Sequence, residues 1–108
     1  MASESALAAG LSELMVLRLV QEQEMYGYEI VQAIAARTRQ MLVPGEGVIY
    51  PLLHALEKDG ALKSRRKTAN GRSRIYYSLT ARGAKRLTAM TEHWTALNGA
   101  VGAVLHAV

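Results

Sequence analysis

The feature that most restricts the fold of this chain is the dipeptide Asn70-Gly71, which separates two strand-like runs, residues 61–68 and 72–79. Asn-Gly favours the two-residue turn between antiparallel strands, because both residues tolerate a positive φ angle. In the second run every other residue is apolar, namely Ile75, Tyr77 and Leu79. We therefore predict a β-hairpin whose second strand buries these side chains and exposes the alternate ones, Arg74, Tyr76 and Ser78.

Three helices are predicted before the hairpin, over residues 5–21, 27–38 and 47–58. The first is apolar around most of its circumference, which indicates burial on more than one side. A turn rich in glycine, with Pro44, separates the second helix from the third. The third carries an amphipathic stripe, tolerates Pro51 near its first turn and ends at Gly60, which suits a left-handed cap. The stripe consists of Ile49, Leu52, Leu53 and Leu56.

A long helix is predicted after the hairpin, from an N-cap at Thr80 to about residue 107. Its apolar residues recur in alternating steps of three and four, the spacing of a heptad seam. The seam consists of Leu87, Met90, Trp94, Leu97, Val101, Val104 and Val108. We expect the small preceding domain to leave this seam uncovered, so that a partner must cover it. We divide the chain into residues 1–79 and 80–108, which form one compact unit.

The composition excludes several classes of site. The chain has no cysteine, which rules out disulfides and thiolate metal ligands. Its three histidines, His54, His93 and His106, are not spaced as a pair of helical metal ligands, so we predict no metal, no cofactor and no catalytic residue. Because the chain has no long apolar run and no basic leader, we expect a cytoplasmic protein without a membrane partner.

The order helix, helix, helix, hairpin, long helix is the plan of a winged helix-turn-helix, a mainly α (α+β) fold. In that plan the third helix enters the major groove of DNA and the hairpin forms the wing. The third helix offers few bidentate donors for base edges, because its predicted exposed face carries no arginine. That face consists of Gly47, Tyr50, Pro51, His54 and Lys58.

Five cations lie within ten residues of the predicted hairpin, in a chain of net charge +4. They are Arg65, Arg66, Lys67, Arg72 and Arg74. A hairpin would bring both groups to one tip, where they could contact DNA phosphates. Charged hairpin tips are also common as solvated turns. The position of this one, directly after a helix-turn-helix pattern, favours DNA binding.

Three segments resemble the PadR family of bacterial transcriptional regulators. They are Tyr26-Gly27-Tyr28-Glu29-Ile30, the third helix from Gly47 to Gly60, and the wing from Gly71 to Gly83. The resemblance covers the chain from about Leu11 onward and adds Tyr28 to the candidate DNA contacts. Val48 departs from the pattern, because the family often has Thr or Ser there and the hydroxyl is lost.

The resemblance implies a homodimer on a pseudo-palindromic operator of double-stranded DNA, usually as a repressor. The last helix would be the dimerisation element, and the first helix would pack on the partner's last helix. The candidate dimer contacts are Leu87, Met90, Trp94, Leu97, Val101 and Val104, with Leu11 and Leu14 of the first helix.

Trp94 has two interpretations. It is either a seam residue or, together with Met90 and Leu97, a platform on which a flat aromatic effector could stack between two protomers. Two other classes of function compete with DNA-binding regulation. An enzyme is disfavoured because no nucleophile motif is present. A dimeric protein-interaction module of winged-helix fold without DNA binding remains the alternative, although it would not need the clustered wing cations.

Overall fold

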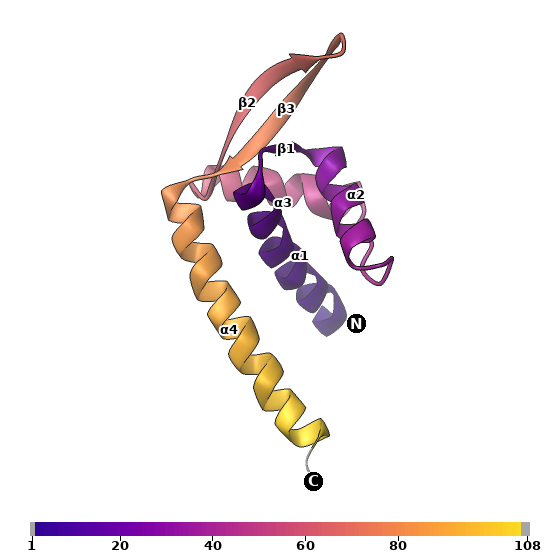
Figure 1. The fold of residues 1–108 in the computed structure, drawn as a ribbon, viewed down its shortest axis with the longest axis vertical. Coiled ribbons are helices and arrows are strands. Elements are labelled where there is room, and N and C mark those ends of the chain that lie inside the picture. Colours follow the sequence, from indigo (N-terminus) through magenta and orange to yellow (C-terminus); the bar gives the residue numbers. More distant parts are fainter. Residues whose placement is uncertain (1, 107–108) are drawn as a thin grey trace.

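The computed structural model describes residues 2–106, with side chains from residue 10 onward, so Val108 of the predicted seam lies outside it. The chain forms four helices and a three-stranded antiparallel sheet in the described residues, which confirms the predicted mainly α, winged-helix fold. The elements are α1 (Ala2–Glu22), β1 (Met25–Tyr26), α2 (Gly27–Arg37), α3 (Glu46–Lys58), β2 (Leu62–Ala69), β3 (Arg72–Leu79) and α4 (Ala81–Leu105) (Figure 1).

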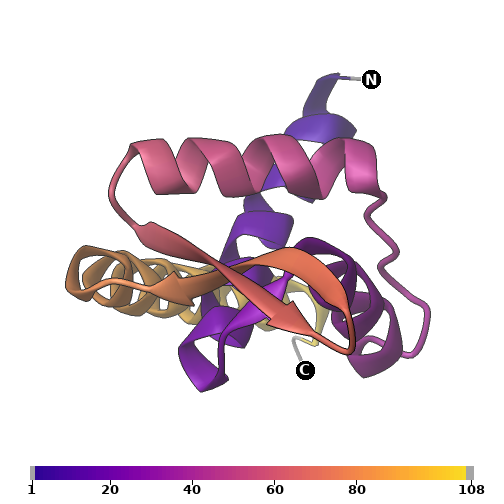
Figure 2. The same ribbon diagram turned by 90° about the horizontal axis from the view of Figure 1, so that it is seen from above.

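The molecule is elongated, with extents of 58 × 29 × 25 Å. The β2–β3 hairpin projects from one end, and α4 runs from the base of the hairpin to the opposite end (Figure 1). Viewed from above, α3 lies alongside the hairpin (Figure 2). The hairpin and the far half of α4 are therefore the parts that extend beyond the helical body.

The core lies between α1, α2, α3 and the base of the sheet. The apolar stripe predicted for α3 is its centre, since Ile49, Leu53 and Leu56 are fully buried and Leu52 packs at the edge. Burying each such side chain stabilises the fold by about 1.5–3 kcal/mol. Residues of α1 and α2 complete the cluster, among them Val16, Leu17, Ile30 and Ile34.

The turns follow the local sequence signals. Asn70 and Gly71 both have positive φ angles, 53° and 76°, as the predicted two-residue hairpin turn requires. Gly60 has a φ of 79° just after α3, which confirms the predicted left-handed position. Pro51 differs from the prediction, because α3 begins at Glu46 and Pro51 therefore lies inside the helix rather than near its first turn.

The strand β1 was not predicted, and it changes the environment of the wing. Met25 and Tyr26 pair with Tyr77 and Tyr76 of β3, so β3 is the central strand of the sheet. The ring of Tyr26 meets the ring of Tyr76 edge to face, with 5.3 Å between centroids. The predicted exposure of Tyr76 is therefore wrong, since only 9% of this residue is accessible.

The first part of α4 belongs to the core of its own chain. Thr80 caps the helix, because its side chain accepts a hydrogen bond from the backbone N–H of Gly83 at 3.0 Å. Leu87 is only 5% exposed and packs in the main cluster. The expectation that the preceding domain leaves the seam uncovered is thus wrong for Leu87, although it holds further along α4. The exposed members of the seam are Trp94 (40%), Leu97 (50%), Val101 (51%) and Val104 (78%).

Within residues 2–106, no helix combines the length and the apolar character that a membrane span requires.

Gly83 provides a test of how closely α4 approaches the end of α3. A Cβ atom at this position would collide with the backbone oxygen of Ala61 and would lie 2.6 Å from Cδ1 of Leu79. We expect Gly83→Ala to lower the free energy of unfolding by about 1–3 kcal/mol, since backbone cannot yield to the added methyl group. Urea unfolding followed by circular dichroism measures this change.

Gly47→Ala is the matched control, because a Cβ atom there would meet nothing within 4 Å. We expect this variant to keep or slightly gain stability, as Gly→Ala in a helix does elsewhere. Equal stability of the two variants would contradict the proposed close approach.

Candidate nucleic-acid interface

A groove of about 400 Å³ lies between the start of α2, the exposed side of α3 and strand β3. The predicted DNA contacts that it brings together are Tyr28, Tyr50, His54, Arg72 and Arg74. Because β1 pairs only with Tyr76 and Tyr77, the part of β3 from Arg72 to Ile75 has no neighbouring strand on this side. This free strand edge contributes Arg72, Arg74 and Ile75 to the groove.

Tyr50 is half-buried and packs against the edge of the core, so the predicted full exposure of this residue is wrong. Its ring lies directly on Gly27, where a Cβ atom would come within 2.5–2.8 Å of two ring carbons and the hydroxyl oxygen. Only glycine at the start of α2 therefore allows the observed position of the ring. His54 follows Tyr50 by one helical turn and is exposed.

The remaining predicted contacts of α3 do not line the groove. Gly47, Pro51 and Lys58 are all exposed, with Gly47 in the first turn and Lys58 at the last residue of the helix. They extend the surface of α3 beyond the groove at both ends.

Arg74 is held by an aromatic ring. Its guanidinium lies 4.4 Å from the centroid of Tyr26, within the range of a cation–π interaction. Tyr26 is itself fixed by β1 pairing and by a capping box, in which the Tyr26 backbone N–H donates to Glu29 Oε1 at 3.1 Å. The side chain of Arg74 is thus positioned by the segment that opens α2.

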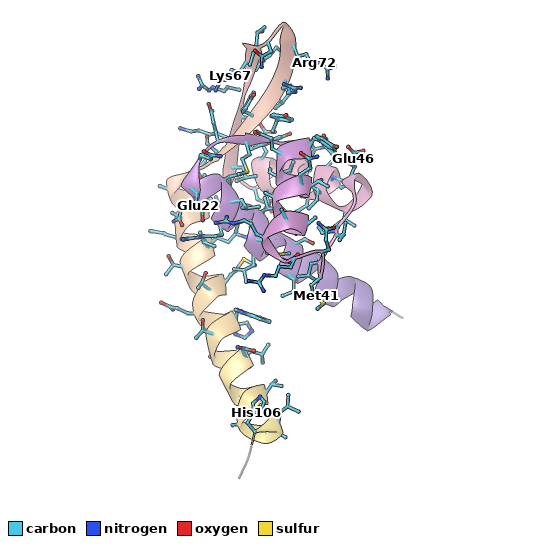
Figure 3. The ribbon with its side chains drawn as sticks, turned by 45° about the vertical axis from the view of Figure 1, so that its right-hand side comes forward. Glu22, Met41, Glu46, Lys67, Arg72 and His106 are labelled. Atoms are coloured by element: carbon cyan, nitrogen blue, oxygen red, sulfur yellow. The ribbon has the colours of Figure 1, made fainter. Side chains whose placement is uncertain are left out.

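The sequence suggested that the five cations of the hairpin gather at its tip. The structure instead divides them between the two faces of the hairpin. Residues opposite each other in an antiparallel pair point to the same face. Lys67 is opposite Arg74 and Arg65 is opposite Tyr76, whereas Arg66 is opposite Ile75 on the other face. Near the tip, the structure places Lys67 on one strand and Arg72 on the other (Figure 3). Arg66 donates a hydrogen bond to Ser73 Oγ at 3.1 Å.

Two of the five cations are already paired with a carboxylate that the sequence analysis missed. Arg65 donates two hydrogen bonds to Glu24, at 2.9 and 2.6 Å, and the Nζ of Lys67 lies 3.0 Å from Glu24 Oε1. The hydrogen bond from Arg65, followed by that from Lys67, lowers the pKa of Glu24 to about 2. Glu24 is therefore negatively charged at any pH near neutrality. Lys67 also lies over the ring of Tyr76, 4.7 Å from its centroid.

A second hollow, of about 420 Å³, lies between α1 and α4. It brings together the candidate ligand residues Met90, Trp94 and Leu97 with the candidate dimer residues Leu11 and Leu14. Because Trp94 is 40% exposed, its indole is open to this hollow in the isolated chain.

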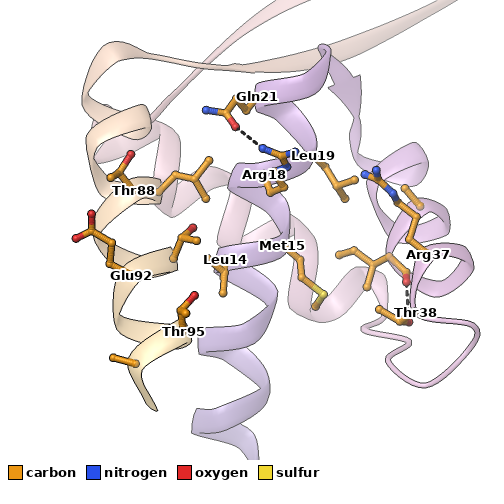
Figure 4. Close-up of a pocket in the computed structure, with 15 residues that line it drawn as sticks. Leu14, Met15, Arg18, Leu19, Gln21, Arg37, Thr38, Thr88, Glu92 and Thr95 are labelled. Carbon is orange, nitrogen blue, oxygen red and sulfur yellow. Dashed lines mark hydrogen bonds between the residues drawn. The ribbon is translucent and has the colours of Figure 1, made fainter. Parts of the chain in front are cut away.

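A larger groove, of about 930 Å³, lies on the other side of α1. Helix α1 runs between α4 and α2, and its side chains Leu14, Met15 and Arg18 lie along the groove (Figure 4). Thr88, Glu92 and Thr95 line the α4 side, and Arg37 and Thr38 line the α2 side.

Among the described residues, no three His, Asp or Glu side chains are grouped as a metal ion would require.

The chain matches the family model described as the transcriptional regulator PadR-like family over residues 16–89. It is 32% identical to the transcriptional regulator Rv3488 of Mycobacterium tuberculosis over 73 residues, which is 68% of this chain and 65% of that protein.

Solved structures agree with this match. A transcriptional regulator from Clostridium thermocellum has 29% identity and a TM-score of 0.82, with 90% of this chain and 95% of that chain covered. A PadR family transcriptional regulator from Eggerthella lenta has 26% identity and a TM-score of 0.81, with 99% and 92% covered.

Proposed function

The chain belongs to the PadR-like family of transcriptional regulators, so it is a DNA-binding regulator and not an enzyme, and we propose that it acts as a homodimeric repressor released by a small molecule. The observation that carries this proposal is the groove that unites Tyr28, Tyr50 and His54 with the wing residues Arg72 and Arg74. A cytoplasmic location follows from the proposed operator, since the DNA is there.

We assign the DNA contacts by element. Helix α3 enters the major groove, where the hydroxyl of Tyr50 and the imidazole of His54 face base edges or phosphates. Arg72 and Arg74 contact the backbone beside the minor groove. Tyr28 contacts DNA from within the groove. The contacts assigned to the ends and the outer side of this surface are Gly47, Pro51, Lys58 and Arg66.

We propose that residues 1–79 hold the DNA and that residues 80–108 pair the protomers. The support is the far half of α4, whose exposed apolar side chains Leu97, Val101 and Val104 follow one side of the helix, as a surface covered by a partner does. The 930 Å³ groove beside α1 is a further apolar surface that a second copy of the chain could fill. A two-fold dimer would read a pseudo-palindromic operator, one half-site per α3.

We propose that the effector is a flat aromatic molecule that binds beside Trp94. The hollow that Trp94 lines with Met90 and Leu97 supports this assignment, because apolar side chains surround an exposed indole there. In the dimer two such indoles would face the axis of symmetry, where a planar ring could stack on them.

Replacing both Arg72 and Arg74 with Gln tests the DNA interface. We expect weaker binding to a duplex from the region upstream of the gene, with a salt dependence shallower by up to about 1.8 per protomer, since each lost phosphate contact contributes about 0.9. Fluorescence anisotropy at several salt concentrations measures both quantities.

The matched control is the pair Arg82→Gln and Lys85→Gln, which removes the same charge from exposed positions of α4. We expect this control to keep the wild-type salt dependence. A wing variant that bound DNA as the wild type does would refute the assignment of Arg72 and Arg74 to the interface.

Val101→Asp tests the proposed dimer. A carboxylate in the apolar seam would have to be buried without a partner, so we expect a monomer in sedimentation at micromolar concentration. Ala103→Asp carries the same charge on a different side of α4, about 200° around the helix from Val101, and should remain dimeric. If Val101→Asp sediments as the wild type does, the seam is not the interface.

Trp94 is the only tryptophan of the chain, so its fluorescence reports on the proposed effector site. We expect a planar aromatic dye that does not itself bind DNA to quench this fluorescence in the dimer and to dissociate the DNA complex. The Val101→Asp variant should show little quenching, because the site needs both protomers. Absence of quenching by any planar dye would argue for a purely structural Trp94.

A further inference from the structure

We propose that Glu24 limits the DNA affinity of the wing, because its carboxylate competes with DNA phosphates for Arg65 and Lys67. This inference rests on the proposed DNA binding. It assigns to a single acidic residue outside the wing the role of setting how many wing cations are free to contact DNA.

In the structure the carboxylate of Glu24 pairs with both cations at once. Arg65 approaches Glu24 through Nε and a terminal nitrogen, and Lys67 shares Oε1 with Arg65. Arg65 and Lys67 alternate along β2 and therefore lie on the same face of the hairpin. Glu24 reaches this face because it directly precedes Met25, which pairs with the neighbouring strand β3.

The paired cations lie on the same face as a proposed DNA contact. Lys67 is directly opposite Arg74 in the ladder, and Arg74 lines the groove with Tyr50 and His54. Opposite residues of an antiparallel pair have Cβ atoms about 4.5–5.5 Å apart. A DNA strand that contacts Arg74 thus comes within reach of the long side chain of Lys67.

The two partners of this cluster differ in their freedom to move. The side chains of Arg65 and Lys67 are 66% and 42% exposed, whereas that of Glu24 is 23% exposed. Glu24 lies next to Met25, which is buried in the core. The cations can therefore swing toward a phosphate while the carboxylate stays at the base of the sheet.

The charge balance gives the direction of the effect. Exposed ion pairs are weak in water, so a phosphate can replace the carboxylate as the partner of either cation. The displaced carboxylate remains negative close to the phosphate, and the two repel each other. Glu24 thus lowers the average number of phosphate contacts that Arg65 and Lys67 make. It also leaves Arg66, Arg72 and Arg74 untouched, since none of these is paired with a carboxylate in the described residues.

The test is the salt dependence of DNA binding by Glu24→Gln. We expect this variant to bind a 30-base-pair duplex of mixed sequence more tightly than the wild type. Each additional phosphate contact would steepen the slope of log K against log salt by about 0.9 and would raise affinity about eightfold at 0.1 M salt. Anisotropy titrations between 0.05 and 0.3 M NaCl measure the slope.

Glu22→Gln is the matched control. Glu22 lies two residues earlier and pairs with Arg37 and Arg18, away from the wing. The substitution Glu22→Gln changes the net charge by the same amount as Glu24→Gln, so any general effect of charge appears in both variants. We expect the slope of Glu22→Gln to equal that of the wild type. A second control is Glu24→Gln combined with Arg65→Gln and Lys67→Gln, which should bind like the variant that lacks only the two cations.

Each outcome decides the proposal. A tighter and steeper Glu24→Gln, with both controls unchanged relative to their parents, supports it. Equal slopes for Glu24→Gln and Glu22→Gln overturn it and leave the proposed function intact. Weaker binding by a folded, dimeric Glu24→Gln also overturns it, because the carboxylate would then position the wing. If the wild-type dimer binds no duplex, including that from upstream of its own gene, the proposed function fails and this proposal fails with it.

Discussion

The close contact between the start of α4 and the turn after α3 fixes the relative placement of the DNA-contacting and extended parts of this molecule. Thr80 Oγ1 lies 2.6 Å from the carbonyl oxygen of Gly60 and 3.0 Å from that of Ala61, and the Thr80 backbone N–H donates to Ala61 as well. Gly83 permits this approach because it has no side chain. The same few residues thus end α3, begin the wing and set the direction of α4. The positions of α3, the hairpin and the long helix therefore depend on one another.

The second constraint is the segment between α1 and α2, which holds the wing from the side. Glu24 pairs with two cations of β2, and Tyr26 stacks edge to face with Tyr76 and under the guanidinium of Arg74. A hairpin of two strands is only marginally stable in water by itself. The added strand β1 and these side chains give the wing a fixed orientation relative to α3. Rigid placement of Arg74 matters because ordering a long side chain on binding costs conformational entropy.

What the sequence could predict was local. Asn70-Gly71, Gly60 and Thr80 each act through their own backbone or a neighbour, so their turn and cap positions followed from residue type. Glu24 could not be found in this way, because 41 residues separate it from Arg65. The burial of Tyr76 was missed for the same reason, since a two-residue strand has no periodicity. Five of the residues that line the groove are candidates from the sequence, but the division of the wing cations between two faces of the hairpin required the strand register.

Helix α1 connects the two functional surfaces that we propose. Leu11 and Leu14 line the hollow beside Trp94, and later residues such as Val16 and Leu17 are buried against the core. The chain then leaves α1 at Glu22 and supplies Glu24 and Tyr26 to the wing within four residues. A helix is stiff along its axis, so a ligand that shifts α1 relative to α4 must also shift this short segment or strain its contacts with β3. The proposed effector site and the wing are therefore linked directly, because a single helix lines the hollow beside Trp94 and also contacts strand β3.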